Sequence, residues 1–311
     1  MSKDKPITGA ELAIGGQAVL EGVMMRGREQ YAVSVLGPDK KVHRLIEKIP
    51  KKTGFALKLR KAPFVRGMFA LIDSLKIGYK ALDFSADVAI DEEDKKEGKQ
   101  TSKEPRKTDA LFMVITVVAS IGLAIGLFKF LPFFLSGFLV NEASSWFVWI
   151  EGLIKASVFI GYLLLISFSR QIRRVFEFHG AEHKAVHCYE NFGLSKKLTA
   201  KHAAQFSRIH KRCGTTFLFL VIFVSIFIYA VIPIQLGFWL SFLIRLLFLP
   251  VIAGISFEIL QLVPKLSDKN PLKWVLMVIE LPGLLLQYIS TREPDEEQLG
   301  VAIDALKHAV K

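Results

Sequence analysis

Metal-binding side chains are concentrated in one short stretch of the sequence. Five of the seven histidines fall between positions 179 and 210. Four side chains in its densest part are spaced so that they share one face of a helix: His179, His183, His187 and Glu190. Neutral imidazoles one turn apart can bind a single divalent ion, and nearby carboxylates complete its coordination shell. We therefore expect a divalent metal site here, and zinc is the ion that these ligands suit best.

The same stretch has the order His-x-x-Glu-His, in which metallopeptidases place two zinc ligands beside a glutamate base. Here the ligands are His179 and His183, and the base is Glu182. Glu182 is then expected to take a proton from a metal-bound water, whose pKa the ion lowers. The pattern therefore predicts a hydrolase. The alternative is an interfacial helix whose histidines and arginines contact lipid headgroups.

Three more ligand candidates lie further along the chain: His210, Cys213 and Glu258. Glu258 interrupts an apolar stretch, where a carboxylate is costly unless it faces a partner or a cavity. We expect Glu258 to complete the coordination shell, with a salt bridge to an arginine such as Arg212 as the alternative. Cys213 offers a thiolate, although a buried cysteine more often serves only in packing.

The segment 15–27 is rich in glycine and reads GGQAVLEGVMMRG. It matches neither the dinucleotide-binding pattern nor the P-loop, so it does not indicate nucleotide binding. Its glycines alternate with Gln17, Glu21 and Arg26, which indicates a backbone that closely approaches another group. The alternative is a tight structural turn packed on the rest of the protein.

Long apolar runs identify the elements that must position these residues. Hydrophobic residues make up 51% of the 311-residue chain, and their concentration in long runs indicates a lipid environment. The run lengths predict four membrane spans and one shorter interfacial segment: about 109–131, 146–169, 214–232 and 237–260, then 274–290. The expected fold class is mainly α, a polytopic α-helical membrane bundle with a small cytoplasmic N-terminal α+β region.

Basic residues give these spans an orientation. Residues 1–108 carry 22 Lys and Arg, and the connection 170–212 carries 10 Lys and Arg against three acids. The connections on the other side are almost uncharged, so the positive-inside rule places both termini in the cytoplasm. The His-rich segment 170–213 then lies at the cytoplasmic face of the bacterial cell membrane. Topology and anionic lipid headgroups explain the net charge of +12, so we expect lipids and no nucleic acid as partners.

The remaining segments differ in character. Residues 1–90 form the cytoplasmic N-terminal region, with a β-hairpin predicted by the two strand-like runs 31–36 and 41–46. Apolar residues at helical spacing over 63–88 then predict an amphipathic helix. The charged segment 91–108 is typical of a flexible linker, and 291–311 predicts a C-terminal amphipathic helix.

Several of these motifs together resemble those of the YqhQ-like family of bacterial multi-pass membrane proteins. They are the glycine-rich segment 15–27, Phe-His-Gly-Ala-Glu-His-Lys at 178–184, Arg-Cys-Gly-Thr at 212–215 and Thr-Arg-Glu-Pro at 291–294. The resemblance covers nearly the whole chain. Members of that family carry the label of predicted metal-dependent enzymes, which implies a metal at the same histidines. Within the family's motif positions lie His179, Glu182, His183, Cys213, Glu21 and Arg26.

The first functional hypothesis is a membrane-embedded, divalent-metal-dependent hydrolase acting at the cytoplasmic interface. A metal transporter or sensor is the second, although Arg245 inside an apolar run repels cations and counts against cation transport. A non-catalytic scaffold or regulator is the third, and assembly into a homo-oligomer is compatible with all of them. The sequence names no substrate.

Overall fold

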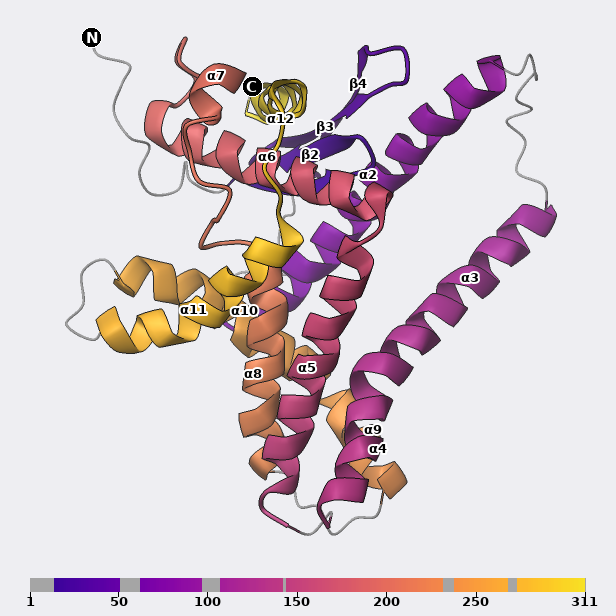
Figure 1. The fold of residues 1–311 in the computed structure, drawn as a ribbon, viewed down its shortest axis with the longest axis vertical. Coiled ribbons are helices and arrows are strands. Elements are labelled where there is room, and N and C mark those ends of the chain that lie inside the picture. The colour runs from indigo at the N-terminus through magenta and orange to yellow at the C-terminus, as the bar shows by residue number, and fades with distance from the viewer. Residues whose placement is uncertain are drawn as a thin grey trace.

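The computed structural model describes residues 14–50, 62–96, 107–141, 144–231, 238–267 and 273–310. The protein is mainly helical with a small N-terminal antiparallel sheet (Figure 1), as expected. The long apolar helices extend away from one end of the molecule, where the sheet lies with α6 (Arg170–Phe192), α7 (Ala200–Ala203) and α12 (Glu296–Ala309) (Figure 1). The sequence elements with candidate functional residues meet at that end.

The sheet is a four-stranded antiparallel meander in the order β1-β2-β3-β4. Its strands are β1 (Gly15–Val19), β2 (Gly22–Arg26), β3 (Gln30–Leu36) and β4 (Val42–Lys48). The predicted hairpin is present as β3 and β4, with Leu36 paired to Val42. The glycine-rich segment forms a second hairpin, whose turn holds Glu21 at a positive φ of 52°.

Helices make up the rest of the described chain. They are α2 (Val65–Lys96), α3 (Lys107–Ile125), the π-helical turn η2 (Gly126–Phe130), α4 (Leu131–Leu139), α5 (Phe147–Ser167), α6 (Arg170–Phe192), α7 (Ala200–Ala203), α8 (Gly214–Val231), α9 (Phe238–Leu247), α10 (Leu249–Ser267), α11 (Lys273–Ser290) and α12 (Glu296–Ala309). Helix α2 includes the predicted amphipathic helix and continues to Lys96, into the segment where a linker was expected. Residues 97–106 of that segment lie outside the described residues.

Three helical segments are long and apolar enough to cross a membrane: Ile115–Leu139, Phe147–Ser167 and Gly214–Val231. A fourth exists if α9 and α10, which meet at a bend of 42°, are counted as one broken span. The bend lies next to Pro250, whose missing N–H interrupts the helical hydrogen bonds. The first segment continues past the predicted end at 131, because Lys129 is buried inside the helix and does not end it.

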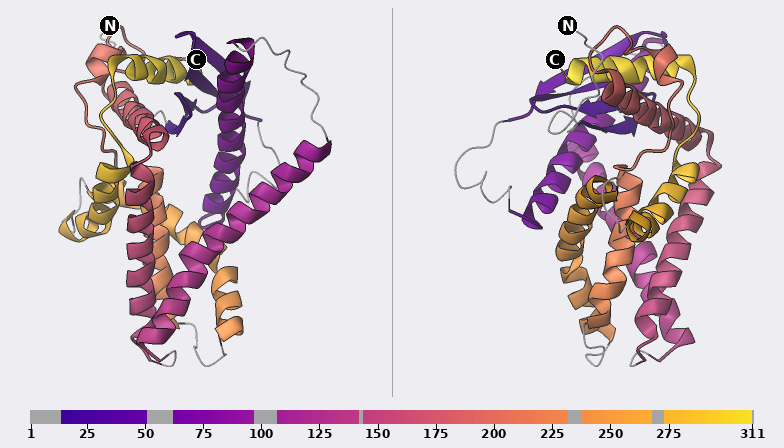
Figure 2. Two further views of the ribbon diagram at one scale, coloured as in Figure 1. Left: turned by 45° about the vertical axis from the view of Figure 1, so that its right-hand side comes forward. Right: turned by 90° about the vertical axis from the view of Figure 1, so that its left-hand side faces the viewer.

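Helices cover both faces of the sheet (Figure 2), and its central strands β2 and β3 are almost wholly buried. Successive side chains of a strand point to opposite faces, and the apolar residues of β2 and β3 therefore divide between two cores. One core joins the sheet to α2 and contains Met24, Val33 and Ile77. The other joins it to α6 and α12. Helix α6 is thus fixed between the sheet and the ends of the apolar helices.

Candidate metal centre

Four imidazole rings form a continuous row at the junction of α6 and the segment that leads into α8. Ring centroids are 4.5 Å apart for His179 and His183 and 5.7 Å for His183 and His210. The row ends with His187, whose centroid lies 4.6 Å from that of His210. Three of the rings come from one face of α6, as the helical spacing predicts, and the fourth comes from the loop beside it.

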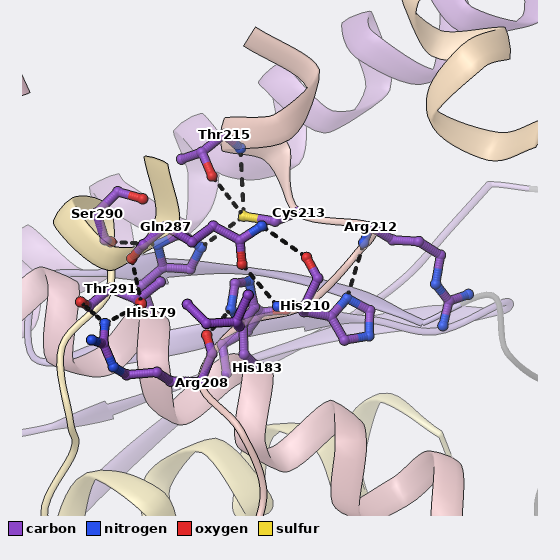
Figure 3. Close-up of polar contacts among 12 residues, drawn as sticks. His179, His183, Arg208, His210, Arg212, Cys213, Thr215, Gln287, Ser290 and Thr291 are labelled. Carbon is purple, nitrogen blue, oxygen red and sulfur yellow. Dashed lines mark hydrogen bonds and ion pairs between the residues drawn. The ribbon is translucent and has the colours of Figure 1, made fainter. Parts of the chain in front are cut away.

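The first part of the row, with one cysteine, forms a group of three ligands. The ligand atoms of His179, His183 and Cys213 all lie within 4.8 Å of one another. The Sγ of Cys213 is 3.3 Å from Nε2 of His179 (Figure 3). His183 and Cys213 are only 2% and 4% exposed. Two imidazoles and a thiolate are a typical ligand set for zinc, which leaves a fourth position open in catalytic sites.

Backbone carbonyls orient both rings of this group. The Nδ1 of His179 lies 2.8 Å from the carbonyl oxygen of Ser290, and Nδ1 of His183 lies 2.5 Å from that of Arg208. A carbonyl oxygen can only accept a hydrogen bond, so Nδ1 carries the proton in each neutral ring. Both Nε2 lone pairs are then available on the side of Cys213. Histidine ligands of metals are commonly held in this way.

Burial also favours the ligand form of His183. Removal from water lowers the pKa of this imidazole, and this outweighs the opposing effects of Cys213 and the Arg208 carbonyl. Because the ordinary value is already about 6.5, the ring is neutral near pH 7. A neutral imidazole is the form that binds a metal ion.

Glu182 lies at the edge of this group, in contact with the sheet. Its carboxylate oxygen Oε2 is 3.5 Å from Nε2 of His183. Burial raises the pKa of Glu182, while the charges of neighbouring histidines and a hydrogen bond from the backbone N–H of Gly16 lower it in part. A β-carbon at position 16 would lie 2.5 Å from Cγ of Glu182. The glycine-rich strand therefore approaches a predicted catalytic residue, as the glycines indicated.

The polar residues of the glycine-rich segment do not join the ligands. Gln17 lies against Gly78 of α2, and Glu21 forms an ion pair with Arg174 of α6. Arg26 is at the end of β2, opposite Gly15. Among the described residues, no group of candidate metal ligands includes Glu21. Glu21 instead attaches the sheet to α6.

The second part of the row forms a separate group, His187, Glu190 and His210, whose ligand atoms also lie within 4.8 Å of one another. Glu190 forms an ion pair with Arg212. The backbone N–H of Arg212 donates to Nδ1 of His210 over 3.2 Å, so Nε2 carries the proton in the neutral ring and faces Glu190 at 3.5 Å. His187 places its Nε2 3.0 Å from the carbonyl oxygen of Ile209. His187 and Glu190 thus lie in a hydrogen-bonded network apart from His179 and His183, which corrects the expectation of one shared site.

Charge in this network keeps Glu190 ionised. Burial alone would raise the pKa of its carboxyl group. The hydrogen bond and charge of His210, with the charges of Arg212 and His187, act more strongly and hold that pKa below its usual value. The carboxylate is therefore already neutralised by protein groups, which leaves it less suited to a metal ion.

Glu258 is located elsewhere, and the expectation that it completes the coordination shell is corrected. Its carboxylate accepts hydrogen bonds from the backbone N–H of Phe64, at 3.0 Å, and from Nε of Arg66, at 2.7 Å. The salt-bridge alternative has the right chemistry, but the partner is Arg66 of α2 and not Arg212. The physical reason is that the start of α2 packs on α10, where a β-carbon on Gly254 would lie 2.6 Å from the carbonyl oxygen of Phe64.

Sequence reasoning missed Gln287, a fully buried residue of α11. Its side chain accepts from the N–H of His210 at 2.8 Å, and donates to the His210 carbonyl at 2.9 Å and to Oγ1 of Thr216 at 3.1 Å (Figure 3). The loop that carries Cys213 is therefore fixed to α11. An amide within a predicted apolar segment was the signal that could have identified it.

The Thr-Arg-Glu-Pro motif contacts the same region. Arg208 donates to both the carbonyl oxygen and the hydroxyl of Thr291, and Lys184 forms an ion pair with Glu293. A β-carbon on Gly180 would lie 2.0 Å from the carbonyl oxygen of Arg292. The glycine-rich segment also reaches Glu182, and Cys213 reaches His179, so all four motifs meet around the candidate metal centre.

Comparisons with known proteins agree with this set of motifs. The sequence model of a family described as "Protein of unknown function (DUF1385)" matches residues 62–311. The chain is also 36% identical over 311 residues to "Uncharacterized protein YqhQ" of Bacillus subtilis (strain 168), which covers 96% of this chain and 92% of that protein. No solved structure matches the chain significantly. The resemblance to YqhQ is confirmed, and the chain belongs to the DUF1385 family.

Proposed function

We propose that this protein is a membrane-embedded, metal-dependent hydrolase with its site at the cytoplasmic surface of the bacterial cell membrane. The observation that carries the proposal is the buried group of His179, His183 and Cys213 with Glu182 beside it. Both imidazoles present Nε2 to the thiol because carbonyl groups hold Nδ1. These side chains match a divalent cation, zinc first, with one position left for a reactant.

Each residue has a defined role in this proposal. His179, His183 and Cys213 would hold a divalent ion, which would supply Lewis acidity at the site. Glu182 would serve as the general base, because its carboxylate faces the Nε2 side of His183 without belonging to the ligand group. Gly16 donates its backbone N–H to that carboxylate and fixes its position.

Membrane placement follows from the apolar helices and the basic residues. Helix α6 lies across the ends of α5 and α8 (Figure 1), and its first turn carries Arg170, Arg173 and Arg174. We propose four spans with both termini cytoplasmic, so that these arginines lie at anionic headgroups. Cysteines introduced at 140 should then be labelled by an impermeant reagent from outside the cell, and cysteines at 196 should not. Labelling at 196 from outside would contradict this orientation.

A metal-binding sensor without catalysis is the second candidate. The observation in its favour is the burial of the site. At most 6% of the surface of each residue is exposed for His183, Cys213 and Glu182. A sensor or structural site needs no access for a substrate. The two candidates share the metal and differ in whether Glu182 acts as a base.

Elemental analysis of the purified full-length chain tests the shared part of the proposal. We expect close to one equivalent of zinc or another divalent ion per chain. His183→Ala should remove it, because a three-ligand site does not survive the loss of one ligand. His187→Ala is the matched control from the same helix face, and it should retain the metal. Wild-type protein that stays metal-free without chelators, and takes up no added zinc, would refute the proposal.

A further inference from the structure

A group of charged side chains is buried inside the apolar helices, far from the histidines. The buried charge cluster consists of Lys129 of η2, Glu151 and Lys155 of α5, and Arg245 of α9. All four residues are at most 7% exposed. Glu151 precedes the start of α6 by 19 residues, or roughly 28 Å along a helix. The cluster is therefore distant from the candidate metal centre, and the two sets have no residue in common.

The contacts within the cluster converge on one carboxylate. Glu151 forms an ion pair with Arg245 through Oε2. Its other oxygen, Oε1, lies 3.4 Å from Nζ of Lys155 and 3.8 Å from Nζ of Lys129. The ring of Tyr229 lies beside all three cations, with its centroid 3.8 Å from Nζ of Lys129. Aromatic faces stabilise cations, but they supply no negative charge.

Positive charge exceeds negative charge in this cluster. Three cations face a single carboxylate among the described residues. Within 110–169 and 214–262 the sequence has only two other acids, Glu142 and Glu258. Glu258 is paired with Arg66, and Glu142 lies outside the described residues. Uncompensated charge inside a low-dielectric environment is costly, and ionisable residues kept there commonly serve a function.

Nζ of Lys129 and Oγ of Ser241 are buried donors without a hydrogen-bond partner in the described part of the chain, and Oε1 of Glu151 is a buried acceptor without one. The side chain of Lys129 is 7% exposed, and Ser241 is 1% exposed. Ser241 lies one turn before Arg245 on the same face of α9. One carboxylate oxygen cannot satisfy two ammonium groups and a hydroxyl group, so the donors of this region outnumber its acceptors.

We propose that the buried charge cluster binds a small monovalent anion, such as chloride, at Lys129 and Lys155. The anion supplies the acceptor that Lys129 lacks and balances part of the excess charge. Arginine does not lose its proton, and Arg245 is already paired with Glu151, so the two lysines carry the site. A small halide suits this site better than a large oxyanion, because all four residues of the cluster are at most 7% exposed and Oε1 of Glu151 already lies beside both ammonium groups.

Binding of radioactive chloride to the purified full-length protein in detergent tests the proposal directly. We expect saturable binding of about one ion per chain, and Lys129→Met should abolish it. Lys129→Arg keeps the positive charge and should retain it. Lys211→Met is the control, because this half-exposed lysine lies 4.0 Å from Glu280 and outside the cluster. Ser241→Ala removes one donor with little change in volume, and should weaken binding by about 10-fold.

Thermal unfolding gives a second measurement. Replacing gluconate by saturating chloride at constant ionic strength should raise the Tm of the wild-type protein by about 2–4 °C or more. The rise should be absent from Lys129→Met, which lacks the site. In gluconate, Lys129→Met should unfold at a higher temperature than the wild type, because the variant removes an uncompensated charge. A wild-type protein that binds no chloride and has the same Tm in both salts would show that the lysines are neutral, and would overturn the proposal.

Discussion

Gly16 and Glu182 touch across the interface between β1 and α6. A β-carbon at position 16 would lie 2.5 Å from Cγ and 2.8 Å from Oε1 of Glu182. Atoms do not approach that closely, so any larger residue at 16 must displace the glutamate or the strand. The sheet thus determines where the proposed base can lie, although it contributes no metal ligand among the described residues.

Gly16→Ala should therefore impair function more than metal binding. Displacing Glu182 is expected to lower the free energy of unfolding by about 1–3 kcal/mol, as overpacking generally does, while His179, His183 and Cys213 keep their metal. Gly15→Ala is the matched control, since a β-carbon at position 15 meets nothing within 4 Å. Complementation of a deletion strain and metal content measure the two effects. Equal behaviour of the two variants would contradict this role of Gly16.

Glu182→Gln separates a catalytic from a purely metal-binding role. Glutamine keeps the shape of the side chain but cannot accept the proton, and loss of general-base catalysis typically costs about 10²–10⁴-fold in rate. The variant should therefore retain the metal and fail to complement a deletion, whereas His183→Ala should lose both. If Glu182→Gln complements fully and His183→Ala does not, the catalytic role is excluded. The metal-binding sensor then remains as the proposed function.

Gln287→Leu should loosen the loop that carries Cys213. The substitution leaves the buried N–H and carbonyl of His210 without their partners, and each buried unsatisfied group costs about 1–3 kcal/mol. We expect a lower Tm and faster loss of metal to a chelator. Met277→Leu, at an exposed apolar position of the same helix, is the control and should retain the metal like the wild type. Unchanged metal loss in Gln287→Leu would contradict the role assigned to this amide.

Asp304 of α12 predicts a pH-dependent contribution to stability. Burial alone would raise the pKa of its carboxyl group, but hydrogen bonds from Arg44 and Ser34 and the charges of Arg44 and His308 lower it overall. A pKa that is lower in the folded than in the unfolded protein stabilises the fold above the unfolded value of about 3.9. That stabilisation is lost as the pH falls through the folded value.

Asp304→Asn should accordingly lower the Tm at pH 7, and the difference from the wild type should shrink progressively below about pH 4. Thermal unfolding across this range measures the effect. Asp73→Asn, in α2 and not in α12, serves as a control for the removal of an acid. A Tm difference for Asp304→Asn that grows as the pH falls would contradict the assigned sign.

Spacing along single elements could be predicted from the sequence. The shared face of His179, His183 and His187 follows from the helical repeat, and the hairpin at β3 and β4 follows from two strand-like runs around a turn. Apolar run lengths likewise identified the helices that are long enough to cross a membrane. The end of the first such segment could not be predicted, because Lys129 is buried among charged and aromatic partners from other helices.

The choice of ligands was decided only by the tertiary structure. His179 and His183 are oriented by carbonyl groups of Ser290 and Arg208, which are 111 and 25 residues away in the sequence. These contacts determine which ring nitrogen faces Cys213, whereas Arg66 removes Glu258 from the candidate ligands. A helical repeat determines the face on which a side chain lies. The group that takes its hydrogen bond depends on how distant segments pack, and no local pattern encodes that packing.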